Sequence, residues 1–274
     1  MSGPERPIRK DEIVLEDRGI YVESWLPERR SRRRPLLLVH GELGGSWLWE
    51  RYLGYFAHRG WEGHAVNLRA HYWSETGDVS GIDLDTYVGD VLATFDHIPP
   101  NPVLVGHGMG GLLALRAAEE RHAAGIVLIS PALPAQLLTP PRAHVIREIP
   151  DAYGRDLLGW QVLAEELRRR NPDLGIEDVL RIQHLMGRES GAARRSMLLG
   201  VPVDRERIGA VPALVIGGGL DRAFPERDSE RLATWLGAQY EPFGAHSHYG
   251  LVIGSESFTQ VAETIRLFLE AHRL

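Results

Sequence analysis

Short runs of uninterrupted apolar residues recur along the chain and alternate with segments whose apolar residues follow a helical period. Runs without polar alternation suit strands that are buried on both faces of a parallel sheet. They lie at residues 35–40, 65–68, 102–105, 125–129 and 212–216. Helical periodicity occupies residues 47–58, 84–97, 111–121 and 228–236, and an amphipathic helix is predicted at 258–269. This alternation predicts an α/β fold with a doubly wound, mostly parallel sheet.

Two regions depart from this alternation. Residues 12–15 and 21–25 are strand-like and are joined by turn residues at 17–19, which predicts an N-terminal hairpin. Residues 131–208 open with a proline-rich stretch and then carry helix-like segments at 157–169, 176–186 and 192–199, with no strand-like run. We therefore predict a core formed by residues 1–130 and 209–274. Residues 131–208 would form a helical cap over the strand ends, where α/β sheets bind ligands.

Composition narrows the chemistry that this chain can perform. The 274 residues include no cysteine, which excludes disulfides, cysteine-ligated metals and a thiol nucleophile. Lys10 is the only lysine, so a Schiff-base lysine for pyridoxal phosphate is not expected. No motif indicates another cofactor, and we expect none.

Charge and hydropathy indicate where the chain acts. The net charge of −6 gives no support to nucleic-acid binding, and the arginine run within 29–34 is interpreted as a solvated loop. The N-terminal residues lack the apolar segment of a secretory signal, and no apolar stretch approaches the ~20 residues of a membrane span. We expect a soluble, cytoplasmic monomer or homodimer that acts on a small molecule, with no membrane partner.

One glycine-dense segment carries the strongest functional signal. From Val103 the chain reads VLVGHGMGG, a buried strand that runs through a sharp turn directly into a helix. That is the context of a nucleophile elbow, G-x-S-x-G, which presents a serine above the sheet. Gly106 and Gly110 are the small flanking residues, and Gly108 stands where the serine would be.

Two other interpretations of these glycines compete with the elbow. Gly106, Gly108 and Gly111 match the dinucleotide-binding pattern G-x-G-x-x-G. That pattern belongs to the first βα unit and is followed by an acidic residue at the end of the next strand. Here at least three strands come first, and the next strand ends in Ile129-Ser130. A plain structural turn is the second alternative, but it does not account for the segments that follow.

Four further segments resemble the α/β-hydrolase superfamily, and together they extend over nearly the whole chain. They are His40-Gly41-Glu42 continuing to Trp49, Asn67-Leu68-Arg69-Ala70-His71, Gly218-Gly219-Leu220-Asp221 with Pro225, and Ser247-His248. They resemble, in turn, the oxyanion loop, a D-L-R-G-H stretch, the acid loop and the histidine loop. The order nucleophile, acid, histidine is the order that this fold uses.

The resemblance implies a role for each position. Asp221 would orient His248, and His248 would act as the base. The backbone N–H groups of Glu42 and Met109 would form the oxyanion hole. His107 is expected beneath the turn and near substrate. A metal site built on His246 and His248 would need a third ligand, so no metal is expected.

The absent serine changes the chemistry that can be expected. Gly108 has no hydroxyl with which to form an acyl-enzyme. Ser46 and Ser130 are the nearest alternative hydroxyls, although neither lies on an elbow. In related loops, such as that of haloalkane dehalogenases, the side chain of the residue after His-Gly faces the pocket. With Glu42 at this position, a carboxylate beside His248 would serve as general acid/base or position a water. The alternative is that Glu42 turns outward or caps a backbone amide.

Three hypotheses follow from this pattern. The first is a cofactor-independent enzyme in which the His248–Asp221 pair acts as general base in hydrolysis, C–C cleavage, dehydration or cyclisation. The second is a catalytically silent binding protein. The third is a serine esterase that was inactivated by a Ser→Gly replacement.

Apolar residues near the expected site indicate the substrate class. Trp47, Tyr72 and Trp160, together with His107, are predicted to line a pocket for a mostly apolar small molecule. The same apolar residues would alternatively pack the cap onto the sheet.

Overall fold

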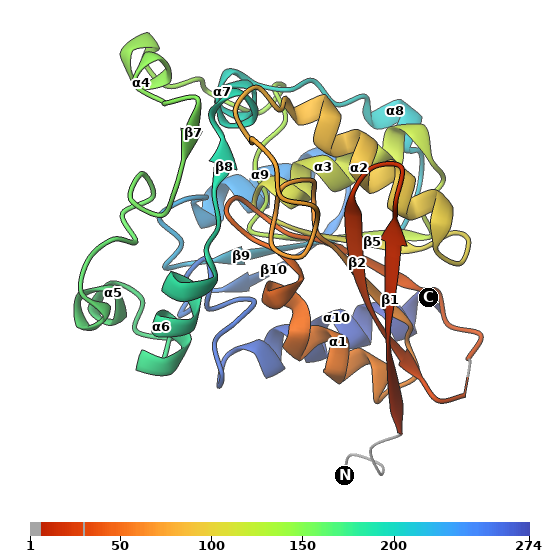
Figure 1. Cartoon of the computed structure of the whole chain (residues 1–274). Coiled ribbons are helices and arrows are strands. Elements are labelled where there is room, and N and C mark those ends of the chain that lie inside the picture. The colour runs from red at the N-terminus through yellow and green to blue at the C-terminus, as the bar shows by residue number, and fades with distance from the viewer. Residues whose placement is uncertain (1–6, 30) are drawn as a thin grey trace.

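The structure is a computed structural model, and it describes residues 7–29 and 31–274. Within these residues the chain forms one large sheet of eight strands in the order β1-β2-β4-β3-β5-β6-β9-β10 (Figure 1). β2 pairs antiparallel with β1 and with β4, and the pairs from β4 to β10 are parallel. The strands are β1 (Ile8–Leu15), β2 (Ile20–Pro27), β3 (Leu36–Val39), β4 (Gly63–Val66), β5 (Val103–His107), β6 (Gly125–Ile129), β9 (Ala213–Gly218) and β10 (Gln239–Phe243).

Helices cover both faces of this sheet, and the central strands show why. In β3, Leu36 and Leu38 belong to the apolar cluster on one face, whereas Leu37 and Val39 belong to the cluster on the other. One face is covered by α1 (Glu50–Ala57) and α10 (Phe258–Ala271), and the other by α2 (Leu84–His97), α3 (Met109–Glu120) and α9 (Glu226–Leu236) (Figure 1). Burial on both faces explains the continuous apolar runs. The predicted α/β architecture is confirmed.

The segment between β6 and β9 lies beyond the carboxyl ends of the parallel strands (Figure 1). It holds five short helices and one two-stranded ribbon among the described residues. These are α4 (Ala143–Arg147), β7 (Ala152–Tyr153), α5 (Ala164–Arg170), α6 (Ile176–Leu185), β8 (Glu189–Ser190), α7 (Gly191–Leu199) and α8 (Arg205–Ile208). We call residues 131–208 the cap segment.

Several local predictions differ from the structure. The cap segment does contain strands, but β7 and β8 are two residues long and give no recognisable pattern. The predicted helix at 157–169 begins only at Ala164, and residues 46–49 form a separate 3-10 helix before α1. β10, with the sequence QYEPF, was not predicted because it is a half-exposed edge strand that contains a proline.

The predicted hairpin is present, and Leu15 pairs with Ile20 at its turn. In the arginine run between β2 and β3, Arg30 lies outside the described residues. Arg33 stacks over the Trp61 ring, with its guanidinium carbon 3.6 Å from the ring centroid. Among helices in the described ranges, none is long and apolar enough to cross a bilayer.

Candidate active site

The loops that follow β3, β5, β9 and β10 meet at one edge of the sheet because these strands run in parallel. At the centre of this edge, Gly108 joins β5 directly to α3, with φ 56° and ψ −121°. Its N–H donates to the Ile129 carbonyl at 3.2 Å, and its carbonyl accepts from the Ala132 N–H at 2.9 Å. The turn therefore has the strained strand-to-helix form of an elbow and is held by β6.

Packing distinguishes Gly108 from the glycines that flank it. A Cβ placed on Gly106 would lie 2.4 Å from the Gly110 carbonyl oxygen, and one on Gly110 would lie 2.2 Å from that of Val39. Both positions therefore require glycine. A Cβ on Gly108 would lie 3.3 Å from Cε1 and Nε2 of His248, with room for a side chain after a small adjustment. Space does not require glycine at position 108.

His248 and Asp221 form a hydrogen-bonded pair beside this turn. His248 Nδ1 lies 2.7 Å from Asp221 Oδ2, and the other oxygen, Oδ1, accepts from the backbone N–H groups of Ala223 and Phe224. Burial acts to raise the pKa of Asp221, but the attraction of His248 and these hydrogen bonds outweigh it and lower that pKa. The ionised carboxylate fixes the imidazole so that Nε2 faces the space above Gly108.

Aromatic rings enclose the His248 imidazole. His107 lies behind it, with ring centroids 4.1 Å apart, and Phe224 and Tyr249 lie at 5.2 and 5.1 Å. The Nε2 of His107 is 3.1 Å from the His248 carbonyl oxygen. Burial lowers the pKa of His107 well below its usual range, so the ring is neutral and donates this hydrogen bond. The sequence placed His107 near substrate, but its ring packs behind His248 and does not line the cavity above it.

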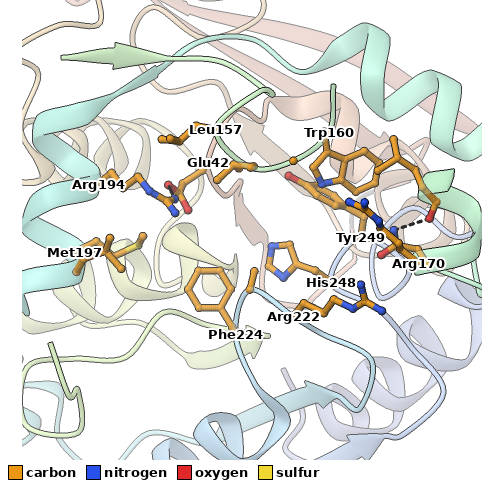
Figure 2. A pocket seen from close by; sticks show the side chains of 16 residues that line it. Glu42, Leu157, Trp160, Arg170, Arg194, Met197, Arg222, Phe224, His248 and Tyr249 are labelled. Atoms are coloured by element: carbon orange, nitrogen blue, oxygen red, sulfur yellow. Dashed lines mark hydrogen bonds and ion pairs between the residues drawn. The ribbon is translucent and has the colours of Figure 1, made fainter. Parts of the chain in front are cut away.

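A cavity of about 360 Å³ opens above His248, between the core and the cap segment (Figure 2). Trp160 lines it and packs edge-to-face on Tyr249, with ring centroids 5.0 Å apart. The core contributes Glu42, Arg222, Ala223, Phe224, His248 and Tyr249, and the cap segment contributes residues 157–160, 167, 170, 171, 194, 197 and 198. The volume suits a small organic molecule.

Two further residues that the sequence placed near substrate, Trp47 and Tyr72, also lie elsewhere. Trp47 is fully buried in the apolar cluster that holds α1 and α10. Tyr72 is half-buried, packs against the same cluster and contacts the Trp73 ring, with centroids 4.9 Å apart. Neither lines the cavity, because both side chains pack in or against this apolar cluster instead.

The backbone of the loop after β3 is held by the cap segment. Leu43 has a positive φ of 59°, which is unfavourable for a branched side chain. Its N–H donates to Glu189 Oε2 at 3.2 Å, and its carbonyl accepts from the Gly187 N–H at 3.0 Å. We call these two hydrogen bonds the Leu43 clamp. The clamp fixes the backbone next to Glu42, while Met109 begins α3 and has an N–H free of helical bonding.

Glu189 is the centre of a buried polar network. Its side chain is fully buried and accepts from Tyr87 Oη at 2.8 Å, and it lies 3.1 Å from His71 Nε2. Burial opposes charge on both groups, but their mutual attraction raises the pKa of His71 and lowers that of Glu189. Burial and the charge of His71 lower the pKa of the neighbouring His40 to about 3. The network is therefore a His71–Glu189 ion pair beside a neutral His40.

The Glu42 side chain turns toward the cap segment and is only 8% exposed. Its Oε1 accepts from Tyr153 Oη in β7 and from an Arg194 guanidinium nitrogen in α7. Figure 2 shows Glu42 and Arg194 facing each other on one wall of the cavity. Burial and the nearby carboxylate raise the pKa of Tyr153, which keeps it a neutral donor. Of the two orientations considered, Glu42 therefore adopts the one toward the cavity.

The alternative hydroxyls and His246 do not line the cavity. Ser46 and Ser130 are both fully buried, and neither lines it. His246 packs against the Phe243 ring, with centroids 5.1 Å apart. Within the described part of the chain, no group of three potential metal-binding side chains is found.

Sequence reasoning missed several residues of this site. Phe224 and Tyr249 adjoin Asp221 and His248 closely enough in sequence for proximity to have suggested them. Tyr153, Arg194 and Glu189 gave no such signal, because they reach the site through the course of the cap segment.

Comparisons with known proteins agree with this fold. The chain matches the alpha/beta hydrolase family over residues 36–264, which is well over half of its length. The protein belongs to the alpha/beta hydrolase family.

Individual relatives are distant. A pyrethroid hydrolase from Sphingobium wenxiniae is 25% identical over 107 residues, and the match spans 38% of this chain and 38% of that protein. A bromoperoxidase from Bacillus anthracis superposes with a TM-score of 0.73 at 16% identity, covering 96% of this chain and 100% of the other. An esterase from Thermogutta terrifontis superposes with a TM-score of 0.72 at 19% identity, covering 97% and 100%. At these identities, the structural matches establish the fold alone.

Proposed function

We propose that this protein is a cofactor-independent enzyme that uses His248 as a general base on a small ester, lactone or other carbonyl compound. The observation that carries the proposal is the position of His248. It is bonded to Asp221 at 2.7 Å, and its Nε2 lies 3.3 Å from the point where a residue at 108 would carry its Cβ. The base is thus aimed at the place where a nucleophile would stand.

In the proposed reaction, a water takes the place of the serine hydroxyl. His248 removes a proton from this water as its oxygen attacks the carbonyl carbon, and the N–H groups of Glu42 and Met109 stabilise the resulting oxyanion. His248 then returns the proton to the leaving oxygen. Asp221 stabilises the imidazolium between these two transfers. With a substrate that has an acidic C–H, the same base removes that proton instead.

We assign Glu42 a structural part in this scheme. Arg194 and Tyr153 both donate to one oxygen of its carboxylate. These bonds hold the side chain in one wall of the cavity and tie the loop after β3 to the cap segment.

Introduction of a serine tests whether the surrounding site is competent. Gly108→Ser should create hydrolysis of p-nitrophenyl esters, because its hydroxyl would lie within reach of His248. Gly108→Ala carries the same Cβ without the hydroxyl and should not gain this activity. The additional change His248→Ala should abolish the new activity. A folded Gly108→Ser protein without esterase activity would contradict an intact base and oxyanion hole.

The native chemistry needs a separate experiment. The unaltered protein and His248→Ala are compared on a panel of esters, lactones and β-diketones by chromatography of the products. We expect at least one substrate to be converted by the former and not by the latter. If both behave alike on every substrate while panel compounds still raise the melting temperature, the protein is a binding protein.

A further inference from the structure

The charged side chains on the cavity wall are unevenly balanced. Among the residues that line it in the described ranges, one is acidic, Glu42, and three are arginines, Arg170, Arg194 and Arg222. Asp221 lies beneath His248 with a side chain 0% exposed, and its oxygens are engaged by His248 and backbone N–H groups. The wall therefore presents more positive than negative charge to a bound molecule.

The three arginines differ in how they are neutralised. Arg194 is paired with Glu42 inside the cavity, and Arg170 is paired with Glu166 one turn away on the exposed side of α5. Arg222 is an exposed residue at the cavity wall, and its side chain forms no ion pair or hydrogen bond within residues 7–29 and 31–274. Its guanidinium is thus available for an anion from outside the chain.

Arg222 also lies close to the reacting centre. It follows Asp221 directly, and Figure 2 shows its side chain beside His248, extending toward the side of the cavity where Arg170 and Tyr249 are drawn. The walls around it are aromatic, with Trp160 and Tyr249 on one side and Phe224 next to His248. A guanidinium offers paired N–H donors in the geometry that a carboxylate accepts.

From this arrangement, we infer that the cavity takes a substrate with an apolar or aromatic body and a carboxylate, and that Arg222 binds the carboxylate. The inference deepens the proposed function, because the carboxylate would lie apart from the carbonyl placed between His248 and Gly108. Binding through Arg222 orients the molecule so that one carbonyl faces the base. A half-ester or keto acid has this chemistry.

Binding of two unreactive probes to the unaltered protein tests the inference. N-benzylsuccinamate has an aromatic ring, an amide carbonyl and a carboxylate, and N-benzylsuccinamide replaces the carboxylate by a neutral amide. Calorimetric titration should give about tenfold tighter binding for the carboxylate, as expected for a charge-assisted contact. Raising the NaCl concentration should weaken binding of the carboxylate and leave that of the amide unchanged.

Substitutions then locate the contact. Arg222→Gln should remove the preference for the carboxylate without changing affinity for the amide. Arg227→Gln removes the same charge from an exposed residue outside the cavity and should have no effect on either probe. Because these measurements require no turnover, their outcome is separate from that of the esterase and panel experiments.

Several outcomes would overturn the assignment. They are equal affinity for the two probes, no measurable binding of either probe, and a preference that survives Arg222→Gln. If Arg170→Gln, and not Arg222→Gln, removes the preference for the carboxylate probe, the contact lies on α5 and the role of Arg222 is refuted. If Arg222→Gln keeps the preference for the carboxylate probe and His248→Ala loses it, the carboxylate binds at the oxyanion site.

Discussion

At the scale of single residues, backbone conformation and packing place different demands on the glycines of the elbow. Gly106 and Gly110 are required because a Cβ at either position would lie 2.4 or 2.2 Å from a backbone oxygen, whereas at Gly108 only the positive φ favours glycine. Local glycine spacing predicted the elbow, whereas the His248–Asp221 pair was expected from the resemblance to the α/β-hydrolase superfamily. Neither could predict the direction of Glu42, which depends on two partners in the cap segment.

A side chain at position 108 should reduce stability. We expect Gly108→Ala to lower the free energy of unfolding by about 1–3 kcal/mol, because its φ and ψ are unfavourable for any residue with a Cβ. Gly237→Ala is the control, since Gly237 has φ 70° at the end of α9 and the atom nearest to a Cβ placed there is 3.6 Å away. This substitution should lower the free energy of unfolding by about 1 kcal/mol. Urea unfolding in which Gly108→Ala costs less than Gly237→Ala would contradict the elbow strain.

At the scale of elements, the short strand β8 does more than its length suggests. Its Glu189 completes the Leu43 clamp and the ion pair with His71, so it connects the cap segment with the loop after β3. The long buried strands and amphipathic helices were predictable because hydrophobic periodicity specifies them. β7, β8 and β10 were not, because two-residue pairings and a half-exposed edge leave no periodic signal.

Loss of the Glu189 charge should destabilise the protein in a pH-dependent way. In Glu189→Gln, His71 stays buried without its partner, so its pKa in the folded state should fall below the unfolded value of about 6.5. Unfolding then takes up a proton at low pH, and the stability of the variant falls as the pH drops through that value. In the unaltered protein the pKa of His71 is raised above its unfolded value. The stabilisation that protonated His71 provides is therefore fully present below about pH 6.5, and it is lost only as the pH rises through the raised pKa.

Glu189→Gln should therefore lower the free energy of unfolding by about 3–5 kcal/mol at pH 5.5 and by less at pH 8, as measured by urea unfolding at both pH values. Glu120→Gln provides the control, because Glu120 forms a partly exposed pair with Arg207 and should cost less than about 1 kcal/mol. An equal loss at the two pH values for Glu189→Gln would argue against the buried ion pair.

At the scale of the whole molecule, the cap segment and the core share one wall of the cavity. Glu42 comes from the core, and its partners Tyr153 and Arg194 come from the cap segment, so this wall of the cavity is formed only when both parts are folded together. The order of motifs along the chain predicted the fold class. It gave no means of matching a cap residue to its partner in the core.

A double-mutant cycle measures this connection. Glu42→Gln and Arg194→Met should each destabilise the protein, and the double variant should lose about 1–3 kcal/mol less than the sum of the two. Arg195 and Asp151 form the matched control, because their pair leaves the Asp151 side chain 83% exposed. The cycle of Arg195→Met with Asp151→Asn should show a coupling near zero. A similarly small coupling between Glu42 and Arg194 would show that the two parts are stabilised independently.

The space above Gly108 also has a genetic consequence. Glycine codons of the form GGC or GGT become the serine codons AGC or AGT by one base change, and no compensating change in the flanking glycines is needed. Where position 108 has such a codon, a single transition therefore separates the proposed water-based reaction from one through a covalent intermediate. From such a codon, selection of spontaneous mutants for growth on an ester should recover Gly108→Ser.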